Sequence, residues 1–293
     1  MRLLKYEVQP GDEGRQIKRI IRGKMGVSHR VFSALKQRHG FILDGEAVFA
    51  NHVVHAGQVI ELTLMDEEGG KAAWDEHPVN VVYEDEDIIV IDKDAPLACQ
   101  SSEKQPENTL ENRLMYRYRD QTFVFRPVNR LDKGTSGLMV AAKHAHAQNI
   151  LQGSLHTDDY VREYLAVVCG APVPEAGEIR APIRKADGAT VRREVGEGGK
   201  PSVTVYRTME KGNEFSLVRL RLMTGRTHQI RVHMAHIGCP VAGDFLYGTE
   251  DERLPGRFAL HSYYLCMKHP ETGEKMEFVS DLPADLQKLI CNS

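Results

Sequence analysis

An acidic segment without apolar periodicity interrupts this chain of 293 residues and limits how it can fold. The segment runs from Asp66 to Pro78 and contains two glycines. Acidic segments of this kind usually stay solvated, so we do not expect one hydrophobic core to run across it. The sequence therefore predicts a small unit over residues 1–65, an acidic linker over 66–77 and a larger domain over 78–293.

The first unit combines two helical patterns with strand patterns. Apolar residues recur at helical spacing over residues 17–21 and again over 31–35, with basic residues between them. Residues 41–48 are typical of a hairpin with an Asp-Gly turn, and residues 58–64 alternate apolar and polar side chains as a strand does. The sequence therefore predicts a small α/β domain with a basic helical pair.

Strand patterns outnumber helical patterns in the larger domain. Two β-branched runs around an acidic turn predict a hairpin over residues 79–92. Helical patterns cover residues 144–155 and a second segment that begins near His228. Further strands are predicted over residues 137–142, 161–168, 202–207 and 215–222. Because few β-α-β units recur, we expect an α+β fold with a mixed, largely antiparallel sheet.

One carboxylate in this domain lies in a position suited to chemistry. Asp132 follows Arg130 and precedes a Gly-Thr-Ser-Gly bend and an apolar strand-like run. A neighbouring cation favours the ionised form of a carboxylate, which can then serve as a nucleophile or a base. On this local pattern alone, a turn residue that hydrogen-bonds its own backbone is the more common outcome.

Four segments that include Asp132 follow one order and spacing. They are Arg130-Leu131-Asp132 with Thr135-Ser136-Gly137-Leu138, then Arg162-Glu163-Tyr164-Leu165-Ala166, then Gly199-Lys200-Pro201-Ser202-Val203-Thr204, and finally Thr224-Gly225-Arg226-Thr227-His228-Gln229-Ile230-Arg231-Val232-His233, which continues to Asp244. In these motifs the chain resembles the RNA pseudouridine synthases of the ribosomal large-subunit type. The resemblance covers about residues 78–283. Asn129 departs from it, because many members have His at this position beside the chemistry.

The resemblance implies that the chain isomerises uridine in RNA to pseudouridine. The bond between ring nitrogen and sugar breaks, the bound base turns, and a ring carbon joins the sugar. Atoms are conserved, so no cofactor is expected, and the chain lacks a dinucleotide or phosphate-loop fingerprint. The resemblance assigns Asp132 as the essential catalyst, which attacks the sugar, attacks the base or abstracts a sugar proton. Arg231 is expected to pair with Asp132, and Tyr164 to stack under the flipped base and to be able to assist the closing deprotonation.

RNA contacts are expected in both parts of the chain. A base inside folded RNA must be extruded to reach a buried carboxylate, and the RNA around it must be held. Four residues near the catalytic motifs are candidates for such contacts, namely Arg130, Lys133, Arg226 and His228. The first unit is similar to the RNA-binding module named after ribosomal protein S-four, which implies further contacts at Arg15, Lys18, Arg22, Arg30, Lys36 and Arg38. Ribosomal RNA is the favoured substrate and transfer RNA is possible.

The charge distribution is compatible with RNA binding although the net charge is −3. Residues 1–60 carry ten basic and five acidic residues, net +5, and residues 178–235 carry twelve and six, net +6. Local positive charge is what meets phosphates. The alternative is that these two basic regions are ordinary solvent-exposed faces that bind no RNA.

The remaining features point to a cytoplasmic protein. The five cysteines are widely spaced and form no Cys-x-x-Cys pair, which argues against disulfides and a zinc cluster. No apolar signal core begins the chain and no apolar run reaches the length of a membrane span. A monomer is expected, because an accessory domain already supplies extra RNA surface.

Two other functions compete with the synthase. His228, His233 and His236 could hold a metal ion in a hydrolase, but their spacing does not reproduce His-Glu-x-x-His, so no metal is expected. A non-catalytic RNA-binding or ribosome-assembly factor is the stronger competitor. The presence of Asp132, Tyr164 and Arg231 together argues against it, because a protein that only binds RNA has no need of a carboxylate beside phosphates.

Overall fold

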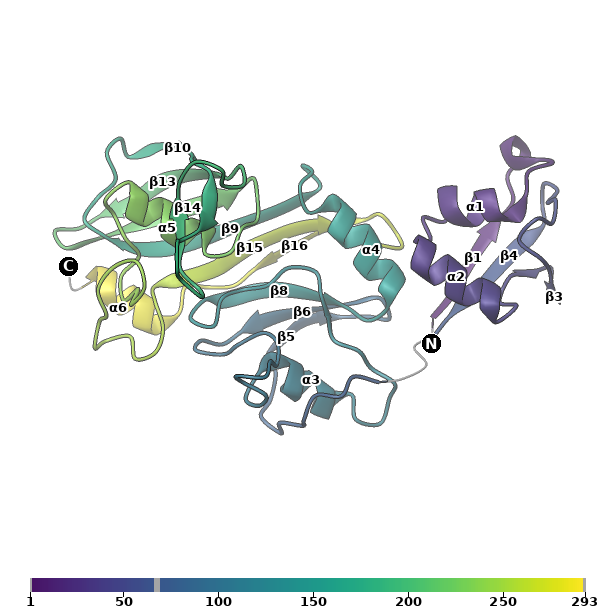
Figure 1. Ribbon diagram of the computed structural model, residues 1–293, viewed down its shortest axis with the longest axis horizontal. Coiled ribbons are helices and arrows are strands. Elements are labelled where there is room, and N and C mark those ends of the chain that lie inside the picture. Colours follow the sequence, from purple (N-terminus) through teal and green to yellow (C-terminus); the bar gives the residue numbers. More distant parts are fainter. Residues whose placement is uncertain (1, 66–68, 292–293) are drawn as a thin grey trace.

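The computed structural model describes residues 2–65 and 69–291 (Figure 1). Residues 66–68, which belong to the predicted linker, lie outside the described residues. Residues 69–77 contain no helix or strand and are hydrogen-bonded to the larger part of the molecule. The Gly70 backbone N–H donates to the Phe123 carbonyl oxygen at 2.8 Å, and Asn112 Nδ2 donates to the Ala73 carbonyl oxygen at 2.9 Å.

The N-terminal part is an antiparallel sheet covered by two helices. The sheet has the order β1-β4-β2-β3, with β1 at Arg2–Glu7, β2 at Ile42–Leu43, β3 at Glu46–Ala47 and β4 at Val59–Leu64. A 3-10 turn, η1 at Pro10–Asp12, precedes helix α1 at Ile17–Gly23 and helix α2 at His29–Gln37. The two predicted helices, the hairpin and the strand after it are confirmed. Their apolar faces form a separate core around Ile20, Leu35 and Ile60.

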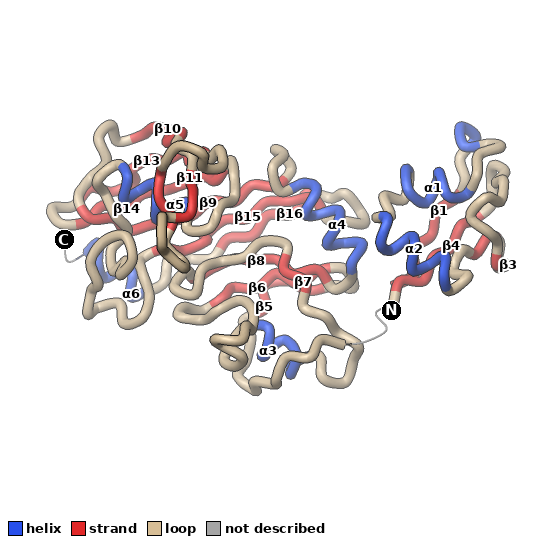
Figure 2. The backbone as a smooth tube through the Cα atoms, viewed as in Figure 1, coloured by secondary structure: helices blue, strands red, loops and turns tan. Residues whose placement is uncertain are grey.

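The larger part is built on one extended sheet (Figure 2). Its order is β10-β13-β14-β9-β15-β8-β6-β5, with β16 paired to β15 and β7 paired to β8. The strands are β5 Val81–Glu84, β6 Ile88–Lys93, β7 Arg126–Pro127, β8 Ser136–Ala142, β9 Tyr160–Cys169, β10 Ala176–Arg180, β13 Val203–Lys211, β14 Phe215–Leu222, β15 Leu260–Lys268 and β16 Lys275–Val279. Among the described strand pairs only β8 and β15 run parallel, so the predicted mixed, largely antiparallel sheet is confirmed.

Both faces of this sheet are buried. Strand β6 shows why: Ile88 and Val90 belong to one apolar cluster, while Ile89 and Ile91 belong to another. Successive side chains of a strand point to opposite faces, so a continuous apolar run suits a strand that is covered on both sides. Helix α4, Ala145–Ser154, packs on the first face through Leu151. Three helices cover the other face: α3 Leu110–Arg117, α5 Gln229–His236 and α6 Ala284–Cys291.

A smaller ribbon lies beside the main sheet. Strands β11, Ile183–Lys185, and β12, Arg193–Val195, pair antiparallel, and β12 lies close to α5. Helix α5 thereby sits between the ribbon and β13. This packing fixes the helix that carries Arg231.

Candidate active site

Asp132 lies in the loop between β7 and β8, as its motif led us to expect. The Thr135 backbone N–H donates to the Asp132 carbonyl oxygen at 3.0 Å and closes the turn. The carboxylate takes no part in this turn, and the Asp132 side chain is 28% exposed. The backbone of Asp132 therefore makes the local hydrogen bond, and its carboxylate faces outward from the loop.

Gly134 and Gly137, the two glycines of the bend after Asp132, lie too close to neighbouring residues to carry a side chain. A Cβ atom on Gly134 would lie 2.8 Å from Cε1 of Phe258. Gly137 has a φ of +104°, and a Cβ atom there would lie 2.3 Å from the Ser262 carbonyl oxygen on β15. Only glycine tolerates both that φ and that approach. The motif around Asp132 is therefore shaped by the packing of its loop on β15 and Phe258.

Arg231 holds the Asp132 carboxylate from helix α5. Its Nη1 donates to Asp132 Oδ2 at 3.1 Å. Its Nε and Nη2 donate to the two carboxylate oxygens of Asp244, at 2.6 and 2.8 Å. The ring of Phe258 lies 4.0 Å from the guanidinium carbon. The bidentate pair and the ring fix the guanidinium plane, so the remaining nitrogen is aimed at Asp132.

Asp244 is a site residue that sequence reasoning missed. It ends the last of the four motifs, but its spacing from Arg231 does not by itself indicate a contact between the two side chains. The structure buries it completely, at 0% exposure, and it also accepts the backbone N–H groups of Leu246 and Tyr247. It is the fixed anchor of the arginine.

Tyr164 lies on β9 and reaches the same cleft as Asp132. It is 5% exposed. Burial, with a smaller effect from the charge of Asp132, raises the pKa of Tyr164 above its usual value near 10. The side chain is thus a neutral phenol at physiological pH.

One cleft brings together most of the predicted site residues of the larger domain. Its walls include the catalytic candidates and three of the four RNA-contact candidates: Asp132, Tyr164, Arg231, Arg130, Arg226 and His228. Lys133 is exposed outside this cleft, with Nζ at 3.4 Å from Gln105 Oε1. The cleft offers one partly exposed carboxylate, one phenol and a rim of cationic side chains.

His228 is held at the start of α5 by Tyr247. It adopts a left-handed φ of 59°, and its Nδ1 lies 2.8 Å from the Tyr247 hydroxyl. Burial lowers the pKa of His228 and outweighs the opposing charge of Asp132. His228 is therefore a neutral hydrogen-bonding group in the cleft at physiological pH.

A buried lysine, Lys93, supports the loop that carries Asp132. It was not identified from the sequence. Lys93, at 1% exposure, donates to the carbonyl oxygens of Asp94 and Leu97, both at 2.7 Å. The Leu97 backbone N–H in turn donates to the Lys133 carbonyl oxygen at 2.9 Å, next to Asp132. Burial lowers the pKa of Lys93 to about 8. A lysine at the end of a strand pattern gives no sequence signal of this supporting role.

The basic candidates of the N-terminal part lie apart from the cleft. Lys18, Arg22 and Arg30 are exposed on α1 and α2, and Arg15 lies just before α1. Arg15 Nη1 lies 3.5 Å from Asp12 Oδ1. The structure brings these residues to one helical layer but not into contact with Asp132.

The three histidines considered for a metal site face different partners. His233 Nδ1 lies 2.9 Å from Thr204 Oγ1, and its Nε2 lies 2.9 Å from the Ala181 carbonyl oxygen. His228 lines the cleft and His236 is exposed. The three side chains therefore do not converge.

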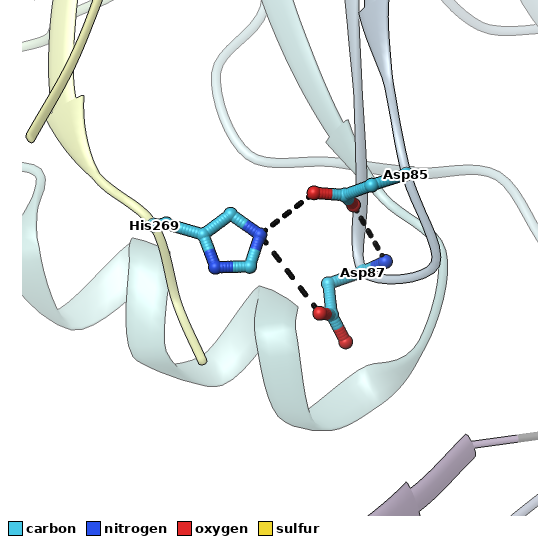
Figure 3. Close-up of side chains that lie close together, drawn as sticks. All are labelled: Asp85, Asp87 and His269. Atoms are coloured by element: carbon cyan, nitrogen blue, oxygen red, sulfur yellow. Dashed lines mark hydrogen bonds and ion pairs between the residues drawn. The ribbon is translucent and has the colours of Figure 1, made fainter. Parts of the chain in front are cut away.

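Another trio, Asp85, Asp87 and His269, is the one group with metal-ligand geometry in the part of the chain that the structure describes (Figure 3). His269 Nε2 lies 2.8 Å from Asp85 Oδ2 and 3.8 Å from Asp87 Oδ2. Asp85 Oδ1 accepts two backbone N–H groups at 2.8 Å, and Asp87 pairs with Arg2 and His144. These partners make the trio an ion-pair network that ties the β5–β6 turn to the end of β15.

Comparison with known proteins establishes the family. Residues 87–236 match the family described as RNA pseudouridylate synthase, and this chain belongs to it. The ribosomal large subunit pseudouridine synthase D of Haemophilus influenzae is 41% identical over 252 residues, covering 81% of this chain and 78% of that protein. An uncharacterized RNA pseudouridine synthase of Bacillus subtilis is 35% identical over 274 residues, covering 92% and 96%.

A solved structure supports the same conclusion. The human RNA pseudouridylate synthase domain containing 1 is 27% identical, has a TM-score of 0.59, and covers 74% of this chain and 95% of its own. The predicted enzyme class, an isomerase that acts on uridine in RNA, and the predicted α+β fold are thus confirmed. No helix within residues 2–65 and 69–291 is long and apolar enough to span a membrane.

Proposed function

We propose that Asp132 is the catalyst of uridine isomerisation in this enzyme, working on a uridine flipped into the cleft beside it. The contact between Arg231 Nη1 and Asp132 Oδ2, at 3.1 Å, carries the proposal. The buried arginine holds the carboxylate in position by a charge-assisted hydrogen bond, and the reaction needs this carboxylate as nucleophile or base. This contact engages Oδ2 of Asp132, and among the described residues none donates a hydrogen bond to Oδ1.

In the overall reaction the bond from the uracil N1 to the sugar breaks and a bond from C5 to the sugar forms. The C5 proton leaves in the closing step, and N1 gains a proton. Tyr164 is a neutral phenol in the cleft, so stacking under the base is the role that its burial favours. To remove the C5 proton it would first have to lose its own, which burial opposes.

RNA is held in this proposal by residues around the cleft and on the N-terminal helices. Arg130, Arg226 and His228 line the cleft, and Lys133 lies exposed beside it. Arg15, Lys18, Arg22 and Arg30 would act from an S-four-type module. Deletion of residues 1–65 should then weaken RNA binding and its salt dependence, and unchanged affinity and slope would show that the helical pair serves packing alone.

The substrate we propose is ribosomal RNA of the large subunit. The relative from Haemophilus influenzae is named for that substrate and is 41% identical to this chain. Transfer RNA is the second candidate. Incubation with each RNA from cells that lack this enzyme, followed by mapping of pseudouridine, separates the two substrates.

The test of the catalyst is tritium release from RNA that carries uridine labelled at C5. Wild type should release tritium, whereas Asp132→Ala should reduce the rate to background and keep its RNA affinity, because the carboxylate acts in chemistry and not in binding. Asp158→Ala, which removes an exposed carboxylate 3.8 Å from Arg221, is the matched control and should retain the wild-type rate.

Two outcomes would contradict the assignment. An Asp132→Ala enzyme that loses RNA binding in proportion to its rate would make Asp132 a binding residue. If neither wild type nor variant releases tritium while both bind RNA, the binding-only assembly factor is the better account of this chain.

A further inference from the structure

A wide groove separates the N-terminal part from the larger domain. Its N-terminal wall is helix α2, and its other wall is the segment 121–128 with the start of α4. The groove has a volume of about 1350 Å³, above the roughly 300–1,000 Å³ of sites that enclose a small molecule. Its size suits a polymer better than a metabolite.

Basic residues predominate among the charged residues that the structure describes along this groove. Six cationic side chains line it: Arg2, Arg30, Arg38, Arg126, Arg130 and Lys143. Glu86 is the only acidic residue among the described lining side chains, and it pairs with Arg2. Cations thus outnumber acids among the described lining residues, and cations on a concave surface attract a polyanion.

Part of this charge is available for a ligand. Arg30 makes no ion pair or hydrogen bond with any residue that the structure describes. Arg130 contacts only the neutral Gln100, at 3.5 Å, among the described side chains. Lys143, in contrast, is already paired with Glu84 at 2.9 Å. The two available arginines come from opposite walls, so a single ligand can bridge the two parts of the molecule.

The groove and the active-site cleft meet at Arg130, which lines both. A strand of RNA whose uridine occupies the cleft therefore has a continuous positive path into the groove. The aromatic side chains of the groove, Phe123 and Phe125, are packed in the apolar core of the larger domain, whereas the lining side chains Arg30 and Arg130 are exposed and cationic. The groove thus suits the phosphate backbone rather than the bases.

We propose that this groove binds the single strand of RNA that runs away from the target uridine, with Arg30 and Arg130 holding its phosphates from the two walls. The proposal rests on the proposed function for the identity of the ligand as RNA. It assigns to Arg30 a role distinct from that of the exposed cations on α1, which do not line the groove. Binding there is expected to be independent of base sequence.

Two substitutions on opposite walls test the proposal with the full-length protein. Arg30→Gln removes a groove cation, and Gln152→Glu places a negative charge on the exposed α4 wall. Their matched controls are Arg207→Gln, an exposed arginine outside the groove, and Asn149→Asp, an exposed position of α4 outside it. Each pair changes the net charge equally and leaves the catalytic residues untouched.

The probe is a fluorescent single-stranded RNA of mixed sequence, titrated at several salt concentrations. Arg30→Gln should lower the slope of log K against log salt by about 0.7, the value for one phosphate contact on a single strand. Gln152→Glu should weaken binding several-fold, whereas both controls should bind as wild type does. If the groove variants match their controls in affinity and slope, the groove does not bind RNA and the proposal is wrong.

A second measurement separates this proposal from the proposed function. Tritium release at saturating RNA should show an unchanged maximal rate for Gln152→Glu and a raised KM. If wild type isomerises nothing while the groove variants still lose affinity, the groove assignment stands and the catalytic proposal fails. If wild type isomerises and the groove variants keep both affinity and KM, the catalytic proposal stands and the groove assignment fails.

Discussion

Arg231 contacts two carboxylates whose environments differ. Asp244 is 0% exposed and binds the guanidinium through two hydrogen bonds, whereas the Asp132 side chain retains 28% of its exposure and accepts one. A buried charge needs a partner, because an unpaired one carries the full desolvation cost. Asp244 therefore fixes the position of Arg231, and Arg231 in turn orients the carboxylate of Asp132.

Stability measurements should separate these two carboxylates. Asp244→Ala leaves the Arg231 charge buried without its bidentate partner and should cost about 3–5 kcal/mol of unfolding free energy. Asp132→Ala removes a partly exposed partner and should cost less than about 1 kcal/mol. Urea denaturation of both variants at neutral pH provides the comparison. Equal losses would mean that Asp244 does not anchor the arginine.

At the scale of the elements, the parallel contact of β8 with β15 positions the catalytic loop. Ser136 and Gly137 pair with His261 and Ser262, directly after the loop that carries Asp132. The approach is close enough that position 137 has room for a hydrogen atom only. The register of two strands far apart in the sequence thus determines where Asp132 lies.

Gly137→Ala should therefore be far more damaging than alanine at an open glycine. The added methyl group would meet the Ser262 backbone in addition to the strain of a positive φ, so we expect a loss of roughly 3 kcal/mol or more. Gly188→Ala is the control, since φ there is +69° but nothing lies within 4 Å, and strain alone costs about 1–2 kcal/mol. Thermal unfolding and tritium release report both effects. Similar losses at the two positions would contradict the close approach.

At the scale of the whole molecule, the N-terminal part is joined to the large domain through a charged and histidine-rich contact. Arg2 on β1 pairs with Asp87, and Asp87 pairs with His144 at 2.8 Å. His144 stacks on His146, with ring centroids 6.2 Å apart, and Gly26 lies close to His146. Protonation of a histidine in this contact would therefore add a positive charge between the N-terminal part and the large domain.

This contact predicts a loss of stability in mild acid. Burial, with the charge of His144, lowers the pKa of His146 from 6.5 to about 4. The unfolded chain therefore binds this proton first, so unfolding free energy falls as pH drops from about 6.5 toward about 4. Urea denaturation at pH 7 and pH 5 should show a loss for wild type larger than that for His146→Gln by on the order of 1 kcal/mol. Identical losses would show that His146 titrates normally.

Much of this architecture can be predicted from the sequence, because helical and strand periodicity are local features of the chain. Periodicity indicated α1, α2, α4 and the hairpins, and the resemblance of the motifs to a known family implied that Asp132, Tyr164 and Arg231 act at one site. Their roles in catalysis and RNA binding stay predictions until the variants are measured. Local periodicity did not reveal that Asp244 binds Arg231, although the two residues are only 13 positions apart, because the contact depends on how the chain folds back after α5.

The amino-acid sequence was sufficient for the family, the fold class and the residues that meet at the cleft, since each depends on residue types at short, fixed spacing. The place of β15 in the middle of the sheet, for which no strand was predicted, emerged only from the three-dimensional packing. The same holds for the support of the site by Asp244 and Lys93, and for the cations of two separate parts that line one groove. Strand order and side-chain contacts depend on how the elements pack in three dimensions, which local periodicity does not encode.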